Sequence, residues 1–296
     1  MVLMELVLIG NQPLASQAGV LTFASGTSSL TIDARHLGFV SPLDVAGVIA
    51  IAHSSWVADL PISLLLPEEP AVATYLRQAG VIDTMPKRTR IHGHAHSGAN
   101  KYPSHRLLRV SLLTTDTVKA VAERFGHLVA SHYPDSAGLA MSRAGNELLA
   151  NAEEHGSSQA GAFVAAQIYT GETTECPRLE LAVCDNGIGV LAHLKRNPKW
   201  DYLTRDEQAL DRARRRRVTG TRDKRGNGLP DLVETAHKHG DIRLHLRSGF
   251  GEITVTKSST RTVAKTRTRP DQTEGTWAWL THEVIRARHS MLQFGK

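Results

Sequence analysis

The order of helix-like and strand-like segments in the C-terminal part of the chain restricts its fold most strongly. Two segments with helical spacing, 117–133 and 136–155, come first. Strand-like segments follow at 162–171, 178–184, 241–246, 251–256 and 275–281. Helices laid on one face of a mixed sheet are the simplest packing for this order. We therefore predict a two-layer α/β sandwich over residues 107–285, with a C-terminal helix or tail over 286–296.

The N-terminal part alternates strand-like and helix-like segments on a smaller scale. In chain order these are the strand-like 30–33, the helical 42–56, the strand-like 62–66 and the helical 70–81. This alternation predicts a small α/β domain with a parallel strand pair over residues 1–86. Residues 87–106 hold few large apolar side chains but contain Pro, Gly, Ser and many basic residues, so we predict a linker or a long surface loop there.

The composition is that of a soluble globular protein. Hydrophobic residues make up 41% of the chain and charged residues 22%. No apolar run reaches the roughly 18 residues that a membrane-spanning helix needs, and the N-terminal MVLMELVLIGNQPL does not look like a signal peptide. The two cysteines, Cys176 and Cys184, indicate neither a disulfide framework nor a zinc site. We expect a cytoplasmic protein that does not enter a membrane.

Much of the positive charge is local. The formal net charge is +6, and basic residues gather at 212–217 (RARRRR) and 261–269 (RTVAKTRTR). Such runs can meet nucleic acid, phosphates or an acidic protein. No aromatic residues are interleaved with them, which makes stacking on single strands less favourable. A solvated loop is the alternative interpretation.

The segment NELLANAEEHG, residues 146–156, carries a row of polar side chains. On a helix, Glu147, Asn151 and His155 are spaced four apart and point to one side, while Leu148 and Leu149 can be buried. By itself this row is either a solvated helix face or a ligand-binding face.

Two glycine-rich stretches offer complementary chemistry. Asp185 follows a strand-like segment, where its carboxylate can accept a hydrogen bond from an exocyclic amine such as that of adenine. Gly187 and Gly189 allow the backbone to approach a flat ring. Gly226 and Gly228 precede a helix whose N-terminus can bind an anion. Each stretch alone is also compatible with an ordinary turn.

The order of these elements is more specific than any one of them. A helical E-x-x-x-N-A-x-x-H-G is followed by D-N-G-I-G at a strand end, G-N-G-L at a helix start and G-T at the last strand. This combination resembles the GHKL ATPase superfamily, which includes histidine-kinase ATPase domains, anti-sigma-factor kinases, gyrase, Hsp90 and MutL. The resemblance covers roughly residues 107–283 and implies the GHKL (Bergerat) ATP-binding fold, with ATP and Mg²⁺ as ligands.

The resemblance assigns roles to the helix and to the loop after it. Asn151 corresponds to the asparagine that binds the Mg²⁺ bridging the ATP phosphates. Glu147 corresponds to the carboxylate that orients or deprotonates the attacking nucleophile, and His155 to a basic or polar residue near the phosphates. Residues 190–225 correspond to the ATP lid. Its arginine run at 212–217 either reaches the γ-phosphate or forms the solvated outer face of the lid.

The remaining correspondences concern the base and the phosphates. By the same resemblance, Asp185 recognises the adenine amine, Gly187 and Gly189 shape the adenine pocket, and Thr276 lies near adenine. The residues expected at the phosphates are Gly226, Gly228 and Leu229.

The N-terminal part resembles a STAS domain, the fold of anti-sigma-factor antagonists. The resemblance rests on TIDARHLGFVSPLDVAGVIAIA followed by ISLLLPEEPAVATYLRQAGV. In that family a phosphorylated serine lies between a strand and a helix, and Ser41 occupies this position. A helix cap is the alternative role for a serine that precedes Pro42.

The function expected from these resemblances is regulatory. No H-E-x-[RK]-x-P segment precedes the second domain, so we do not expect a conventional sensor histidine kinase, and the module is most similar to the anti-sigma-factor serine kinases. We expect Mg²⁺-dependent hydrolysis of ATP, or phosphorylation of a serine on the chain itself or on a protein partner, in partner-switching signalling. A nucleotide-sensing module without turnover and a nucleic-acid-associated protein are the alternatives, and a homodimer is possible.

Overall fold

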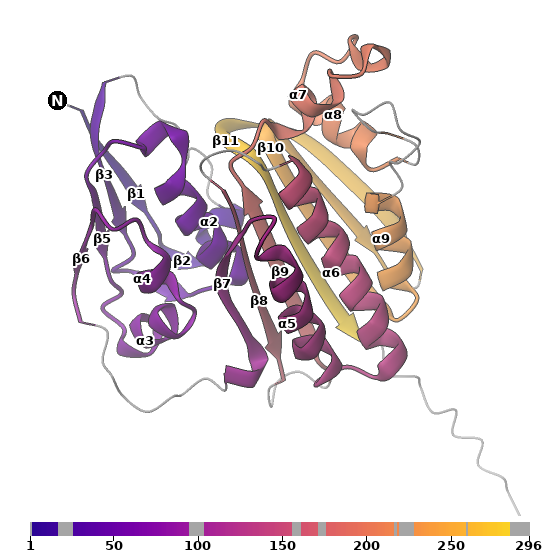
Figure 1. Ribbon diagram of the computed structural model, residues 1–296, viewed down its shortest axis with the longest axis horizontal. Helices are drawn as coiled ribbons and strands as arrows, with labels where there is room; N and C mark the ends of the chain where they lie inside the picture. The colour runs from indigo at the N-terminus through magenta and orange to yellow at the C-terminus, as the bar shows by residue number, and fades with distance from the viewer. Residues whose placement is uncertain are drawn as a thin grey trace, which may run out of the picture.

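The described part of the chain forms a four-stranded sheet, a five-stranded sheet and a small two-stranded sheet, with helices between and outside the two larger ones (Figure 1). The computed structural model describes residues 2–16, 26–94, 104–155, 161–170, 176–215, 218, 228–258 and 260–284. The strands are β1 (Val2–Val7), β2 (Gly10–Asn11), β3 (Thr27–Asp33), β4 (Leu37–Phe39), β5 (Ile62–Leu65), β6 (Thr89–His92), β7 (Leu107–Leu113), β8 (Ala162–Tyr169), β9 (Arg178–Asp185), β10 (Gly240–Lys257) and β11 (Thr262–Val284).

The helices follow the same order along the chain. They are α1 (Pro13–Ser16), α2 (Pro42–His53), α3 (Pro70–Gln78), α4 (Val81–Thr84), α5 (Val118–Ala130), α6 (Asp135–His155), α7 (Gly189–Leu194), α8 (Asp206–Ala213) and α9 (Gly228–His237). Short 3₁₀ turns, η1 to η3, lie at Ser55–Val57, Ser104–Arg106 and Pro198–Trp200. None of the helices in these described ranges is long and apolar enough to cross a membrane.

Both units are of the α/β type, as predicted, but the second sheet differs in strand direction. The first sheet has the order β1-β3-β5-β6 with parallel pairings. The second has the order β10-β11-β9-β8-β7, and its described pairings are antiparallel. The prediction of a mixed sheet was therefore wrong for this part of the described chain. Strand direction depends on how the connections run, which the hydrophobic pattern does not reveal.

Helix α2 lies between the two sheets and packs on the second one (Figure 1). It is apolar on all sides, and its residues Pro42 to Ala52 are buried. Such a helix is stable only inside a core. One apolar cluster joins α2 to strands of both sheets; from the second sheet it includes Phe163, Ala165, Ala182, Cys184 and Trp277.

The second sheet is therefore covered on both faces. Helices α5, α6 and α9 lie on one face, and α2 from the N-terminal unit lies on the other (Figure 1). This corrects the expectation of helices on one face only. The reason is that the strands carry apolar side chains on both faces, and an apolar sheet face must be buried against another element.

The predicted linker is partly structured. Within residues 87–106, Thr89–His92 form β6, which pairs in parallel with β5 and completes the described part of the first sheet. Directly after this stretch comes β7, a strand that the sequence interpretation did not identify, at the edge of the second sheet. Its sequence, LLRVSLL, has the apolar content of a strand, so the residues themselves carried a usable signal.

Ser41 caps α2. Its Oγ accepts a hydrogen bond from the Asp44 backbone N–H (3.2 Å), and it donates one to the Asp44 carboxylate (2.7 Å). The same carboxylate accepts from the Ser41 N–H (2.9 Å), which completes a capping box. Ser41 has no exposed surface. In this conformation its hydroxyl is not accessible to a kinase, so the geometry favours the helix-cap role over the phosphoacceptor role.

The packing of α2 leads to a testable expectation at Gly47. A Cβ there would lie 2.7 Å from Leu14 Cδ1 and 2.9 Å from Trp277 Cζ3. Alanine normally stabilises a helix interior by about 1 kcal/mol relative to glycine, but overpacking costs about 1–3 kcal/mol. We expect Gly47→Ala to lower the free energy of unfolding.

The matched control is Gly126→Ala on α5, where the nearest atom to an added Cβ is Ser142 Oγ at 3.9 Å. This substitution is expected to raise stability. Denaturant unfolding of both variants is the measurement, and equal stabilisation by the two alanines would contradict the close packing of α2 on the second sheet.

Candidate functional site

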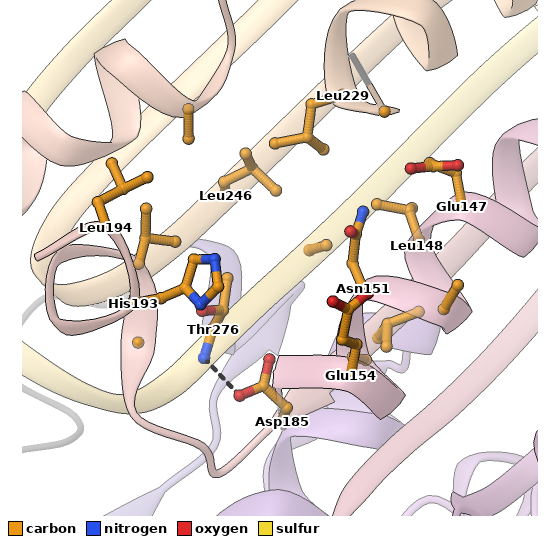
Figure 2. Close-up of a pocket in the computed structure, with 18 of the residues that line it drawn as sticks. Glu147, Leu148, Asn151, Glu154, Asp185, His193, Leu194, Leu229, Leu246 and Thr276 are labelled. Atoms are coloured by element: carbon orange, nitrogen blue, oxygen red, sulfur yellow. Dashed lines mark hydrogen bonds between the residues drawn. The ribbon is translucent and has the colours of Figure 1, made fainter. Parts of the chain in front are cut away.

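A cavity of about 380 Å³ lies between α6, the face of the second sheet, α7 and the start of α9 (Figure 2). It lies within the size range of pockets that bind small molecules, roughly 300–1,000 Å³. Seven residues that the sequence singled out line it: Glu147, Asn151, Asp185, Gly189, Gly228, Leu229 and Thr276. These residues come from segments far apart in the sequence, so their convergence is a result of tertiary folding.

The carboxylate of Asp185 is held in place by two backbone donors. Its Oδ1 accepts hydrogen bonds from the N–H groups of Gly187 (2.8 Å) and Thr276 (3.1 Å). The second oxygen points into the cavity (Figure 2). Burial raises the pKa of Asp185 to about 7, although both backbone hydrogen bonds act in the opposite direction. A donor supplied by a ligand would stabilise the ionised form, because hydrogen bonding to a carboxylate favours its charge.

Gly187 acts on the cavity through Asp185. It fixes Asp185 through its backbone N–H and is not among the cavity-lining residues.

Glycine at position 275 permits the approach of β11 to Asp185. Gly275 has φ +69°, and an added Cβ would lie 2.1 Å from the Asp185 carbonyl oxygen. A side chain is disfavoured at this φ for conformational reasons as well. The G-T pair at the last strand therefore consists of a glycine that allows close approach and a threonine whose N–H holds the carboxylate.

Ser248 connects the elements around Asp185. Its buried hydroxyl accepts a hydrogen bond from the Val190 N–H (2.8 Å) at the start of α7 and donates one to the Gly275 carbonyl (2.9 Å). The Thr276 hydroxyl lies 3.5 Å from Ser248 Oγ. Ser248 thus sets the position of α7 over the sheet. No motif in the sequence pointed to it.

Helix α6 presents Glu147 and Asn151 to the cavity, as its spacing predicts. Leu148 and Leu149 on the same helix are buried in the core between α6 and the sheet. The apolar side of the helix therefore fixes its rotation, and this rotation turns the polar row toward the cavity.

Glu147 lies directly against the start of α9. A Cβ added to Gly228 would lie 1.9 Å from Glu147 Oε1. Backbone N–H groups at a helix N-terminus favour nearby negative charge. Glycine at this position leaves room for the carboxylate beside the first turn of α9.

The part of the cavity near Asp185 has apolar walls. Val183, Leu246 and Ala278 come from three strands of the sheet, and Val190 and Leu194 come from α7. A slot with apolar walls and one fixed carboxylate suits a flat, mainly apolar ring that carries a hydrogen-bond donor.

Two polar residues of the cavity were not predicted from the sequence. Glu154 lies on α6, three residues after Asn151, and its helical spacing was a usable signal. His193 lies on α7 and is buried (Figure 2). Nothing in the local sequence distinguishes His193 from an ordinary helix residue.

Two predicted site residues are not described fully. His155 is the last residue of α6, and its side chain lies outside the described part of the chain; Gly226 lies outside it altogether. Within the predicted lid, 190–225, the described residues contain most of α7, the turn η3 and α8, which share a small core of Leu194, Trp200, Leu203 and Ala209.

The described arginines of the run at 212–217 are engaged with neighbours on the protein surface. Arg214 and Arg215 both pair with Asp211 (2.7 Å each), and Arg212 lies over the Tyr202 ring. In the other basic run, Arg267 and Arg269 pair with Glu252. These contacts favour the interpretation of the lid run as a solvated surface, and they leave fewer cations for a nucleic acid.

The loop that carries Asp185 is also bonded to α2. The Asn186 side chain is buried and donates its Nδ2–H to the Ala50 carbonyl (2.8 Å). On the same side of the sheet, Ser55, just after α2, donates to the Glu274 carboxylate beside Gly275. Asn186, next to Asp185 on its loop, and Glu274, next to Gly275 on β11, therefore both contact the N-terminal unit.

Comparison with known proteins does not assign the chain to a family. No family model matches it, and no curated protein matches it significantly. The functional argument therefore rests on the residues of the cavity.

Proposed function

We propose that the cavity binds ATP together with Mg²⁺, in the manner of the GHKL ATPases. One observation carries the proposal: one cavity is lined by residues that the resemblance assigns to the nucleophile, the metal, the base and the phosphates, namely Glu147, Asn151, Asp185, Thr276 and Gly228. Chance grouping is a poor explanation, because these residues come from α6, β9, α9 and β11.

Asp185 would select the base. The oxygen of Asp185 that points into the cavity can accept a hydrogen bond from the exocyclic amine of adenine, and the slot lined by Val183, Leu246 and Ala278 would hold the ring. A base with a carbonyl oxygen at the position of the amine would bring an acceptor against this carboxylate and be rejected.

Asn151 and the start of α9 would receive the phosphates. The side-chain amide oxygen of Asn151 is a hard ligand of the kind that Mg²⁺ accepts. Mg²⁺ is usually held by one or two protein groups plus phosphates and water, so one amide oxygen fits a metal that arrives with the nucleotide. When bound, Mg²⁺ supplies neutralisation of phosphate charge. The backbone N–H groups in the first turn of α9, which begins at Gly228, would bind the same phosphates.

Glu147 would handle the proton of the nucleophile. It lies one helical turn before Asn151 on the same cavity wall, where its carboxylate can orient water or a serine hydroxyl and accept its proton. Hydrolysis and phosphorylation of a serine on a protein partner need the same group, so we propose the class of reaction without choosing between them. Ser41 is not proposed as the acceptor, because its hydroxyl is buried.

The contacts of Asn186 and Glu274 with the N-terminal unit favour a regulatory output. A change in the Asp185 loop on nucleotide binding would act on α2 through the Asn186–Ala50 hydrogen bond. The same contacts support the second candidate function, nucleotide sensing without turnover. In the first candidate function the γ-phosphate leaves ATP, whereas in nucleotide sensing ATP stays intact. We expect the γ-phosphate to leave, because Glu147 is present.

Substitution of Asn151 tests the proposal most directly. We expect Mg²⁺ to raise the affinity of the wild-type protein for ATP, and Asn151→Ala to remove that increase while the Mg²⁺-independent affinity remains. Calorimetric titration with ATP, in Mg²⁺ and in EDTA, measures both quantities. The matched control is Asn146→Ala, which changes an exposed asparagine on the same helix, outside the cavity lining. An Asn151→Ala protein with unchanged Mg²⁺ dependence would refute the metal-binding role.

A further inference from the structure

A second cavity, separate from the candidate nucleotide site, lies where the N-terminal unit meets the edge of the second sheet. Its volume is about 810 Å³. Its walls come from α3 and α4, from β7 with the preceding turn η2, and from α5. None of the described residues lines both cavities.

The walls of this cavity carry an excess of positive charge. Arg77, Arg109 and Arg124 line it, and among the described lining residues Asp83 is the single carboxylate. Asp83 pairs with Arg109. Among the described residues, Arg77 and Arg124 have no carboxylate within ion-pair distance, and Arg124 donates only to Ser111 Oγ (3.3 Å). Two guanidinium groups are therefore available to an anion.

The cavity also has an apolar floor and histidines at its rim. Leu107, Leu108 and Leu128 contribute the apolar part, and two of these three are buried. His105 and His127 lie beside the arginines, and His105 is stacked on His132, with ring centroids 5.5 Å apart. A cationic rim over an apolar floor matches an anionic head on an apolar body.

The position of β7 fixes this geometry. The Val110 N–H donates to the Ala79 carbonyl (2.8 Å), which holds β7 against the end of α3. Gly80, with φ +85°, follows at once, and an added Cβ there would lie 3.3 Å from Arg109 Nε. Arg77 and Arg109 therefore come from two segments that backbone contacts hold together.

We propose that this cavity binds a small organic anion, with a carboxylate or phosphate head held by Arg77 and Arg124 and an apolar body on the leucine floor. Arginine is suited to both heads, because its planar fork donates two parallel hydrogen bonds. The cavity volume is that of a small-molecule site. The apolar floor, and the lack of Phe, Tyr and Trp among the described lining residues, favour a small amphiphile over a nucleic acid strand. This inference does not rest on the proposed ATP function.

The test uses the full chain and the fluorescent anion 8-anilinonaphthalene-1-sulfonate as the probe. We expect saturable binding that the double substitution Arg77→Ala/Arg124→Ala weakens at least tenfold, since a hydrogen bond to a charged group contributes about 1.5–3 kcal/mol and 1.4 kcal/mol is tenfold. The control pair Arg143→Ala/Arg243→Ala, at exposed arginines outside this cavity, should leave the dissociation constant unchanged.

A substitution with the opposite expected effect separates binding from folding. Asp83→Asn removes the acidic residue of the described lining and should tighten probe binding several-fold, which a loss of structure cannot do. Octanoate and octyl phosphate should displace the probe, and the better of the two identifies the head group. Unchanged affinity in the double arginine variant, displacement by ATP alone, or stronger displacement by a DNA duplex than by both amphiphiles would each overturn the proposal.

Discussion

Replacement of Asp185 by asparagine is expected to reverse the base preference of the protein. In the wild type, Oδ1 of Asp185 accepts from two backbone N–H groups, and the other oxygen is directed into the cavity. Asparagine must keep its single oxygen for those backbone donors, so its NH₂ group would face the adenine amine, donor against donor. We expect the affinity for ATP to fall at least about 100-fold, which corresponds to about 2.7 kcal/mol.

The same variant should gain affinity for inosine triphosphate, whose base carries a carbonyl oxygen in place of the amine. Titration of both nucleotides against both proteins measures the reversal. Asp135→Asn, an exposed aspartate in the first turn of α6, is the matched control and should leave both affinities unchanged. If Asp185→Asn bound ATP as tightly as the wild type, the assignment of the base site would be wrong.

Replacement of Glu147 by glutamine should stop turnover while ATP still binds. Glutamine keeps the shape of the side chain but cannot accept the proton of a nucleophile, and general-base catalysis contributes about 10²–10⁴-fold in rate. We therefore expect release or transfer of the γ-phosphate to fall by that factor, with the dissociation constant for ATP within about threefold of the wild-type value. Incubation with γ-labelled ATP and Mg²⁺ follows the label into free phosphate or onto protein.

The control for this measurement is Glu123→Gln on α5, an exposed glutamate away from the cavity. Label on protein that disappears in Glu147→Gln would identify a kinase, and label in free phosphate would identify an ATPase. A wild-type protein that binds ATP but leaves it intact would remove the catalytic part of the proposal and favour nucleotide sensing. Equal turnover by wild type and Glu147→Gln would exclude Glu147 as the base.

The candidate site was largely predictable because its residues lie in short segments with strong local constraints. The four-residue spacing of Glu147 and Asn151 puts both on one side of any α-helix, and the leucines beside them determine which side is buried. Ser248 and His193 were not predictable in this way. Their roles depend on which strand pairs with β11 and where α7 lies, and neither is encoded within a few residues of them.

The largest error concerned the relation of the two units. The sequence of α2 is apolar on all sides, which indicates a helix buried on all sides, but the pattern does not say against what. The structure puts this helix between the two sheets, so the N-terminal unit supplies a layer of the second one.

The amino-acid sequence was sufficient to predict the local elements: the polar face of α6, the strand that ends at Asp185 and the glycine before Thr276, with a helix cap as one of two roles for Ser41. These follow from helix and strand periodicity, from side-chain hydrogen bonding near the chain and from glycine's freedom at positive φ. The antiparallel order of the second sheet, the burial of Ser41 and the convergence of α6, β9, α9 and β11 on one cavity became visible in the three-dimensional structure alone. The physical reason is that these features depend on which apolar surfaces meet, and burial of apolar area is non-directional, so many pairings satisfy it until the whole chain packs.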